Sequence, residues 1–356
     1  MYDIVIIGLG PAGATLARHI SKNYSVLALD KRDLLSPHKN GGFEKSCGGL
    51  LAPDAQEMLA KFGLGLPKDV LVDPQLFTVR TIDIPNALEA YYQRHYINLD
   101  REKFDRWLVS LIPQNVELCC ESLLKSFEPE SERVKIIYKK NSKEYTAYTK
   151  ILVAADGANS IIRRALCPES FKIKTYISIQ EYFKVDKNTP FFSAIFDEEI
   201  CDFYSWTIPK EDYFILGSAL RPRDNVNNKF ELLKTKLKKY NFNFDNKIKR
   251  NGAYILRPEK TKQIFLGTDR VAFIGEAAGL ISPSSAEGLS YGFKSAYILS
   301  KALEPSLNNY NNRYQSSIKH LISNLFIKNF KAQIIYNPKI RKTIIRLGIN
   351  SMKMYS

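Results

Sequence analysis

The feature that most constrains the fold is a glycine-rich turn near the start of the chain. Gly8, Gly10 and Gly13 follow the apolar run at residues 4–7 and open a stretch with helical spacing. In such a G-x-G-x-x-G turn the first glycine permits a tight bend, the second lets a pyrophosphate approach the backbone, and the third lets helix and strand pack closely. Asp30 ends the next apolar run, where a carboxylate can accept a hydrogen bond from a ribose hydroxyl. This order of strand, turn, helix, strand and acid predicts a βαβ unit that binds a dinucleotide.

Length and cysteine usage narrow the class of protein. A chain of 356 residues can bury one large core or two medium ones. The sequence starts directly with a strand-like run, and no run reaches the roughly eighteen apolar residues of a membrane span, so we expect a cytoplasmic protein. The five cysteines are odd in number and lack paired ligand spacing, which predicts neither a disulfide framework nor a metal site.

The net charge of +15 is concentrated near the C-terminus. Residues 305–356 contain nine Lys or Arg and no Asp or Glu, and apolar residues recur among them at helical spacing. This pattern suits a helix that lies on an anionic membrane surface, but it is also typical of a solvated helical face. No nucleic-acid-binding motif accompanies the charge, so we do not expect a nucleic-acid partner.

Two kinds of pattern alternate along the chain. Residues 1–33 are typical of βαβ, Asp100 begins a helix over 100–112, and residues 151–165 and 270–303 are typical of strand, turn and helix. Residues 175–219 instead alternate aromatic and β-branched residues, which predicts an antiparallel sheet. We therefore predict an α/β protein with three parts: a discontinuous nucleotide-binding domain (1–65, 95–165 and 265–303), an inserted substrate domain (66–94 and 166–264) and a basic helical region (304–356).

A second turn follows the apolar run at residues 151–155. Gly157 allows the bend after Asp156, Ser160 is a good helix N-cap, and Arg163 lies in the first helical turn. The pattern predicts another close approach of the backbone to a cofactor, although an ordinary strand-to-helix turn would look the same.

A third turn follows a later apolar strand. It begins with Gly275 and Glu276 and continues through Pro283 to Gly288 and Leu289, where a helix is expected to start. The three turns together resemble those of the flavoprotein family that includes aromatic hydroxylases and geranylgeranyl reductases, over residues 1 to about 303. The resemblance implies a Rossmann-like FAD-binding domain with FAD as cofactor, held by Gly8, Gly10, Pro11, Ala12, Gly13, Asp30, Lys31, Cys47, Gly48, Arg101, Asp156, Gly157, Gly275, Glu276, Pro283, Gly288 and Leu289.

The resemblance also implies a role for each part of this set. The glycines of the first turn take the diphosphate, Asp30 takes the adenosine ribose, and Arg101 takes the polar chain of the cofactor. Glu276 stands where the family has Asp, so its reach is one methylene longer. The helix that starts at Gly288 would place its N–H groups and its dipole against the negative charge of a reduced flavin, which stabilises that charge by roughly 0.3–2 kcal/mol.

Two further segments are similar to those of geranylgeranyl reductases within this family. Cys47 begins a Cys-Gly-Gly loop, which in that group lies beside the flavin ring. Tyr204, Trp206 and Pro209 match the substrate-pocket motif Y-x-W-x-F-P, with Ile208 where the group has Phe. The stretch is also one residue from the W-x-W-x-I-P of flavin halogenases, but no motif identifies the lysine which those enzymes need.

The resemblance implies an FAD-dependent oxidoreductase that reduces carbon–carbon double bonds of an apolar substrate such as an isoprenoid. Cys47 would supply a proton or position the substrate, or it is only a small loop residue. Two other functions stay open: an FAD-dependent monooxygenase of an aromatic or antibiotic-like compound, and a flavoprotein that binds a lipid carrier or partner without turnover. The sequence shows no second nucleotide-binding turn, so the electron donor is NAD(P)H in transient contact or a ferredoxin. Residues 305–356 would contact the inner face of the cell membrane.

Overall fold

The computed structural model describes residues 1–36, 46–349 and 351–353. Its first sheet has seven strands. Six follow the order β6-β2-β1-β9-β8-β7, and β15 pairs with the last residues of β9. The central pairs β1–β2, β1–β9, β2–β6 and β9–β15 are parallel, whereas β7, β8 and the first half of β9 form an antiparallel meander. The strands are β1 (Tyr2–Ile7), β2 (Val26–Leu29), β6 (Val116–Cys119), β7 (Ser122–Pro129), β8 (Val134–Lys140), β9 (Lys143–Ala154) and β15 (Val271–Phe273).

The second sheet has eight strands in the order β14-β10-β13-β12-β11-β4-β5-β3. The alternation predicted for residues 175–219 forms β10 to β13, which pair in antiparallel fashion, while β11 also runs parallel to β4. The strands are β3 (Leu50–Leu51), β4 (Leu76–Asp83), β5 (Leu88–Asn98), β10 (Lys174–Lys184), β11 (Phe191–Phe196), β12 (Ser205–Lys210), β13 (Tyr213–Leu220) and β14 (Lys247–Arg257).

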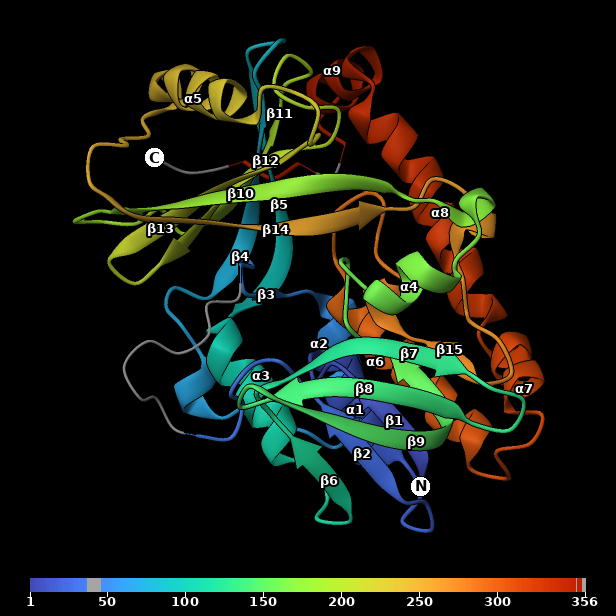
Figure 1. Cartoon of the computed structure of the whole chain (residues 1–356). Coiled ribbons are helices and arrows are strands. Elements are labelled where there is room, and N and C mark those ends of the chain that lie inside the picture. The colour runs from blue at the N-terminus through green and yellow to red at the C-terminus, as the bar shows by residue number, and fades with distance from the viewer. Residues whose placement is uncertain (37–45, 350, 354–356) are drawn as a thin grey trace.

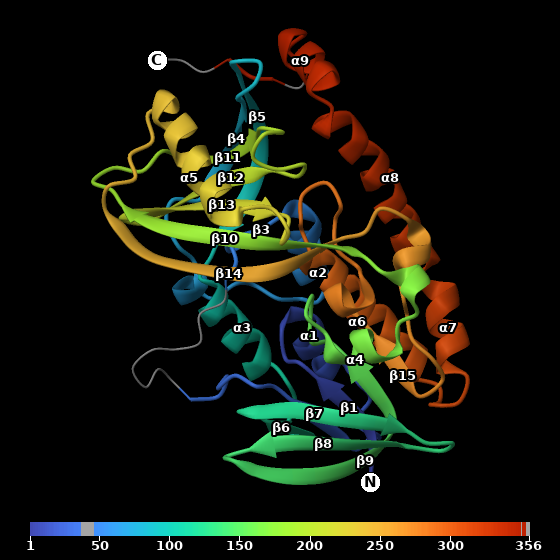
Figure 2. The same ribbon diagram turned by 45° about the horizontal axis from the view of Figure 1, so that its top comes forward.

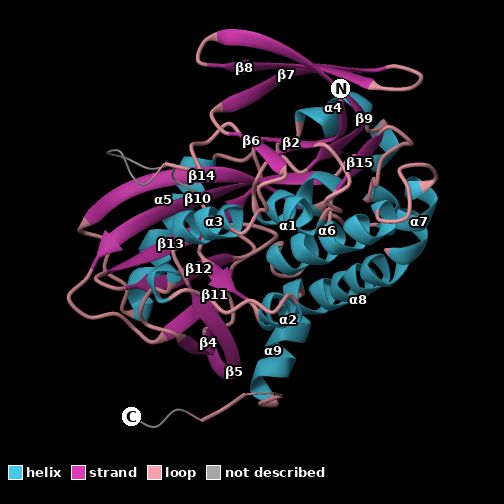
Figure 3. Cartoon of the chain, turned by 90° about the horizontal axis from the view of Figure 1, so that it is seen from below, coloured by secondary structure: helices cyan, strands magenta, loops and turns pink. Residues whose placement is uncertain are grey.

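Helices separate the two sheets and cover the outer face of the eight-stranded sheet. Helices α1, α3 and α6 lie between the sheets, and α5 lies on the far side of the eight-stranded sheet (Figures 1 and 2). Seen from below, α1, α6, α7 and α8 run side by side (Figure 3). The helices are α1 (Pro11–His19), α2 (Pro53–Lys61), α3 (Arg101–Ser110), α4 (Ile161–Leu166), α5 (Val226–Leu237), α6 (Leu289–Leu303), α7 (Tyr310–Ser317), α8 (Lys319–Tyr336) and α9 (Pro338–Arg346).

Local sequence explains where several helices begin. The Asp100 side chain accepts hydrogen bonds from the backbone N–H groups of Glu102 (2.8 Å) and Lys103 (3.0 Å), which confirms the predicted start of α3. Ser160 accepts from the N–H of Arg163 (3.0 Å) and caps α4 in the same way. Proline in the first turn of α1, α2 and α9 has no N–H to leave unsatisfied.

Each sheet has its own apolar core. Strand β1 is buried on both faces between β2 and β9, as expected for the centre of a parallel sheet. Phe230, Leu233 and Leu237 of α5 are fully buried against the eight-stranded sheet. The predicted α/β class, with a nucleotide-binding sheet and a second sheet inserted into it, is confirmed. Among the described residues, no helix combines the length and apolar character that crossing a bilayer requires.

Candidate active site

The glycine turn that joins β1 to α1 leaves no space for a side chain at its first and third glycines. Gly8 has a φ of +98°, and a Cβ atom there would lie 2.6 Å from the carbonyl oxygen of Ala155 at the end of β9. A Cβ atom on Gly13 would lie 1.8 Å from the carbonyl oxygen of Gly8. The packing of the chain itself therefore requires glycine at both positions.

Gly10 differs from these two glycines. Its φ is −68°, which any residue adopts, and a Cβ atom there would meet no atom of the described residues within 4 Å. Gly10 is the N-cap of α1, has no side chain that could cap the helix, and is followed by Pro11. The space in front of it lies at the positive end of the helix dipole, where a diphosphate binds favourably. The turn therefore fits the diphosphate of the cofactor, and the chain alone gives no other reason for glycine at this position.

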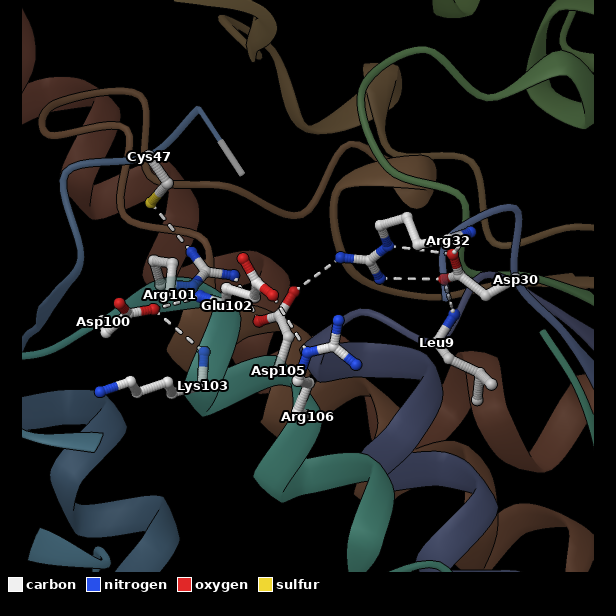
Figure 4. Close-up of polar contacts among 10 residues, drawn as sticks. All are labelled: Leu9, Asp30, Arg32, Cys47, Asp100, Arg101, Glu102, Lys103, Asp105 and Arg106. Carbon is white, nitrogen blue, oxygen red and sulfur yellow. Dashed lines mark hydrogen bonds and ion pairs between the residues drawn. The ribbon is translucent and has the colours of Figure 1, made fainter. Parts of the chain in front are cut away.

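A chain of charged side chains leads from this turn to Cys47 (Figure 4). Arg32 forms ion pairs with Asp30 and with Asp105, both at 2.9 Å. Arg101 pairs with the second oxygen of Asp105, also at 2.9 Å, and its other terminal nitrogen donates to Cys47 Sγ at 2.9 Å. The Asp105 side chain is fully buried and lies between the two arginines in this series of charged side chains. Sequence reasoning missed Arg32 and Asp105, although the spacing of Arg101 and Asp105 on one helical face could have indicated their pairing.

Asp30 has a structural role in addition to the one expected from the sequence. Its Oδ2 accepts a hydrogen bond from the N–H of Leu9 at 2.7 Å and so fixes the glycine turn. Burial alone would raise the pKa of Asp30, but the hydrogen bonds from Arg32 and Leu9 outweigh it and hold the pKa below its usual value. Asp30 is therefore ionised at neutral pH, as a carboxylate that accepts from a ribose hydroxyl must be. Its contact with the ribose remains a prediction.

Two buried polar atoms near the turns have no hydrogen-bond partner in the described part of the chain. They are Arg101 Nε and Asp156 Oδ1. Buried polar groups are nearly always hydrogen-bonded, because each unsatisfied one costs about 1–3 kcal/mol. Burial also raises the pKa of the Asp156 carboxyl. Polar groups of a bound FAD would satisfy both atoms, so these residues fit the cofactor that the sequence implies.

The second and third turns are held together by Arg163. Its guanidinium donates to the carbonyl oxygens of Ala277 (3.0 Å) and Gln263 (2.8 Å). The third turn is a short 3₁₀ helix, η5 (Gly275–Ala278), and a Cβ atom on Gly275 would lie 3.0 Å from the Cβ of Ala12 in α1. The first and third turns thus meet at the start of α1. The second turn is connected to the third by the hydrogen bonds of Arg163.

The later residues of the cofactor set have contacts within the chain. Glu276 accepts a hydrogen bond from the N–H of Leu256 in β14 at 3.0 Å, so its longer side chain reaches the second sheet. At the start of α6, which Gly288 caps before Leu289, the carboxylate of Glu287 accepts from the N–H of Ser290 at 2.7 Å. The carboxylate of Glu287 therefore already accepts a hydrogen bond from one of the backbone N–H groups that the sequence analysis assigned to the flavin ring. The carbonyl oxygen of Pro283, in the preceding loop, accepts from Arg257.

The Cys-Gly-Gly loop packs against β12. A Cβ atom on Gly48 would lie 2.2 Å from Cδ1 of Ile208, so the loop touches this strand directly. Side chains alternate along a strand, so Tyr204 and Trp206 share the face of Ile208. The rings of Tyr204 and Trp206 are 5.3 Å apart between centroids. The structure thus brings the predicted aromatic residues and the Cys47 loop to the same side of the sheet.

Pro209 is on the other face of β12. It lies opposite Phe214 of the neighbouring strand β13, and its carbonyl oxygen accepts a hydrogen bond from the side chain of Asn98 at 2.8 Å. Tyr204 instead donates through its hydroxyl to the carbonyl oxygen of Ser285, in the loop that precedes α6. Of the three residues expected to line a pocket, only Tyr204 and Trp206 therefore face the nucleotide-binding domain.

Lys210 ends β12, and sequence reasoning gave it no role. The side chain is 4% exposed, and its Nζ donates to the carbonyl oxygens of Leu99 (2.8 Å) and Gly49 (3.3 Å). A buried amine thus holds the Cys-Gly-Gly loop in place. Burial lowers the pKa of Lys210 from 10.5 to about 7.

This shift makes the stability of the protein depend on pH in a defined window. Between pH 7 and pH 10.5 the unfolded chain binds a proton at Lys210 that the folded protein lacks. The free energy of unfolding should therefore rise with pH in this window, by about 1.4 kcal/mol per pH unit relative to the Lys210→Met variant. Urea unfolding at pH 7.5 and pH 9.5 measures the difference. The exposed Lys238→Met is the control, and parallel pH profiles for Lys210→Met and wild type would contradict the assignment.

Comparison with known proteins gives relatives over the whole chain. No family model matches the sequence. The protein CbrA of Escherichia coli K12 is 41% identical over 350 residues, covering 98% of this chain and 97% of CbrA. Protein CbrA of Shigella sonnei is 41% identical over 348 residues, with the same coverage.

Solved structures share the fold at low sequence identity. A geranylgeranyl bacteriochlorophyll reductase-like protein from Thermoplasma acidophilum has a TM-score of 0.78 and 19% identity, covering 99% of this chain and 92% of its own. The L111Y mutant of halogenase PltM, solved in complex with FAD, has a TM-score of 0.70 and 16% identity, covering 94% of this chain and 76% of its own. The p-nitrophenol 4-monooxygenase PnpA from Pseudomonas putida has a TM-score of 0.65 and 16% identity, covering 99% of both chains. The chain thus has a fold that FAD-dependent enzymes use.

Residues 47–55, 204–206 and 274–279 also resemble those of the bacterial colicin M resistance protein, and the matches to CbrA confirm this resemblance. The identity of 41% extends over almost the whole length of both chains. The protein therefore belongs to the CbrA family.

Proposed function

We propose that the protein is an FAD-dependent oxidoreductase that reduces carbon–carbon double bonds in an apolar substrate such as an isoprenoid. The observation that carries the proposal is the hydrogen bond from Arg101 to Cys47 Sγ, beside the aromatic face of β12. Arg101 belongs to the residues that fit the cofactor, so this bond connects the cofactor site to a group that can transfer a proton. The similar fold of the Thermoplasma protein supports the same reaction class.

The reduction needs a hydride at one carbon and a proton at its neighbour. The residues that fit FAD would hold it beside Cys47, and when bound and reduced it would supply the hydride. Cys47 donates the proton from Sγ, and the guanidinium of Arg101 stabilises the thiolate that remains, because a nearby arginine favours that form. Solvent then reprotonates the sulfur. Tyr204 and Trp206 bind the apolar part of the substrate and exclude water from the reacting bond.

The electrons come from outside the chain. The sequence contains no second nucleotide-binding turn, so the proposal includes NAD(P)H in transient contact or a ferredoxin as the donor. Supplying each to the purified enzyme in turn, with formation of reduced flavin as the readout, separates the two.

Replacing Cys47 tests the proton transfer. Cys47→Ala should lower the rate of substrate reduction, measured per bound flavin, about 10²- to 10⁴-fold, the usual effect of losing a general acid. Cys167→Ala, which removes another partly exposed thiol, should keep the wild-type rate. An undiminished rate in Cys47→Ala would show that Cys47 is not the proton donor.

Product analysis tests the reaction itself. Dithionite-reduced enzyme is incubated without oxygen with geranylgeraniol, and with its fully saturated analogue as the control. The proposal expects two added hydrogen atoms for each double bond reduced and no change in the saturated compound. If the alcohol returns unchanged, the reductase function is wrong for prenyl substrates. An oxygen atom added to an aromatic compound in air would favour the monooxygenase, whose fold PnpA shares.

A further inference from the structure

The C-terminal helices form one edge of the molecule. Helix α8 runs along both the cofactor domain and the second sheet, and α9 continues from it beside the outer end of that sheet (Figures 1 and 2). Pro338 begins α9, and the side chain of Asn337 caps it. In the segment whose sequence suggested a membrane contact, residues 310–346 therefore form helices that belong to the fold.

Contacts on the inner side fix these helices in place. Lys328 pairs with Asp54 at 2.9 Å. Arg341 is 4% exposed and pairs with the fully buried Asp83 at 2.8 Å. Tyr336 donates to the carbonyl oxygen of Ser284 at 2.9 Å. These contacts use two of the nine basic side chains, and Arg313 uses a third by donating to backbone carbonyl groups.

The outer side of α8 carries a cluster of exposed apolar side chains. Phe326, Ile327 and Phe330 are 59%, 57% and 63% exposed, and their spacing places them on one side of the helix. Of the large apolar side chains that are exposed in the described part of the chain, half lie between residues 326 and 352. Scattered exposed apolar residues are normal, but a concentration of them marks an interaction site.

Helix α9 combines apolar and basic flanks. Ile340 and Leu347 are 42% and 69% exposed and lie seven residues apart, on one flank. Lys339, Lys342 and Arg346 recur at helical spacing on the adjacent flank, and they form no ion pair within the described residues. We call these five residues, together with Phe326, Ile327 and Phe330, the C-terminal patch.

We propose that the C-terminal patch docks the protein on an anionic lipid bilayer. Exposed apolar side chains flanked by lysine and arginine are the chemistry of a helix that lies in a membrane interface. Residues 305–356 contain no acidic side chain, so nothing within them opposes approach to a negative surface. A symmetric dimer through the patch would set these cations against their own copies, which disfavours a second copy as the occupant. The inference concerns a surface outside the flavin site and holds whether or not the enzyme reduces a lipid.

Sedimentation with vesicles tests this surface. The flavin-loaded full-length protein is spun with vesicles of phosphatidylcholine alone and of phosphatidylcholine with phosphatidylglycerol. We expect binding to the anionic vesicles only. Each cation near a membrane contributes about fivefold, so the triple variant Lys339→Glu, Lys342→Glu, Arg346→Glu should weaken binding by at least about a hundredfold. The variant Phe326→Ser, Phe330→Ser tests the apolar contribution and should weaken it by at least about tenfold.

A matched control separates this patch from the overall positive charge. The variant Lys125→Glu, Lys238→Glu, Lys239→Glu changes the net charge equally at exposed positions elsewhere and should bind as wild type does. Bound FAD and the unfolding temperature report that each variant is folded. The proposal fails if wild type ignores anionic vesicles, or if the control variant loses as much binding as the patch variant. A concentration-dependent dimer that the phenylalanine variant abolishes would likewise overturn it, in favour of a second copy.

Discussion

Replacing Gly10 with valine should remove FAD from the protein while the polypeptide keeps its fold. A Cβ atom at Gly10 meets nothing within 4 Å in the part of the chain that the structure describes, and the backbone there is one that any residue adopts. Valine would instead fill the space before α1 that the diphosphate needs. Overpacking of this kind costs about 3 kcal/mol, so FAD should bind about a hundredfold more weakly. Flavin absorbance of the purified variant and thermal unfolding of the flavin-free protein measure the two effects separately.

Two other glycines provide controls. Gly65→Val also adds a side chain at a position whose Cβ would have no described residue within 4 Å, and this variant should keep both fold and FAD. Gly13→Val would meet the carbonyl oxygen of Gly8 and should lose both. A Gly10→Val protein that purifies with a full complement of FAD would show that the diphosphate does not bind at this turn.

Removing the carboxylate of Asp105 should destabilise the protein by about 3–5 kcal/mol. Asp105 is fully buried between Arg32 and Arg101, and each guanidinium lies 2.9 Å from one of its oxygens. Asp105→Ala would remove the carboxylate that lies between two guanidinium groups and leave their positive charges close together. Urea unfolding of flavin-free protein measures the loss. Because Arg101 also positions Cys47, the variant that remains folded should reduce substrate slowly.

The control for this prediction is an ion pair at the surface. Glu304 pairs with Lys301 at 2.9 Å, and both side chains are more than half exposed. Exposed pairs contribute little, so Glu304→Ala should unfold at the wild-type urea concentration. If Asp105→Ala unfolded there too, the buried chain of charges would have no structural importance.

The sequence predicts those features that local backbone chemistry determines. The glycine turn, the capping of α3 by Asp100 and of α4 by Ser160, and the alternating strands β10 to β13 all depend on residues near one another in the chain. Motif spacing also placed Tyr204 and Trp206 on one face. Pro209 lies three residues beyond Trp206, so the alternation of the strand places it on the opposite face, and its role in a pocket stays a prediction.

The missed residues act through contacts between distant segments. Arg32 meets Asp105 across 73 residues, and Lys210 meets Leu99 across 111. Arg341 reaches Asp83 across 258 residues, which turns part of the basic C-terminal segment into a structural element. Periodicity and turn chemistry describe one segment at a time, so they cannot indicate which distant charge will lie opposite another.

The measurement that tests the central claim most directly is stopped-flow re-oxidation of the reduced protein. The flavin is first reduced without oxygen, then mixed with geranylgeraniol or with buffer alone while its absorbance is followed. Our account predicts that the oxidised spectrum returns with the lipid in the absence of oxygen, and that it does not return with buffer. Re-oxidation that requires oxygen, at a rate which an aromatic compound changes and the lipid does not, would contradict a carbon–carbon double-bond reductase.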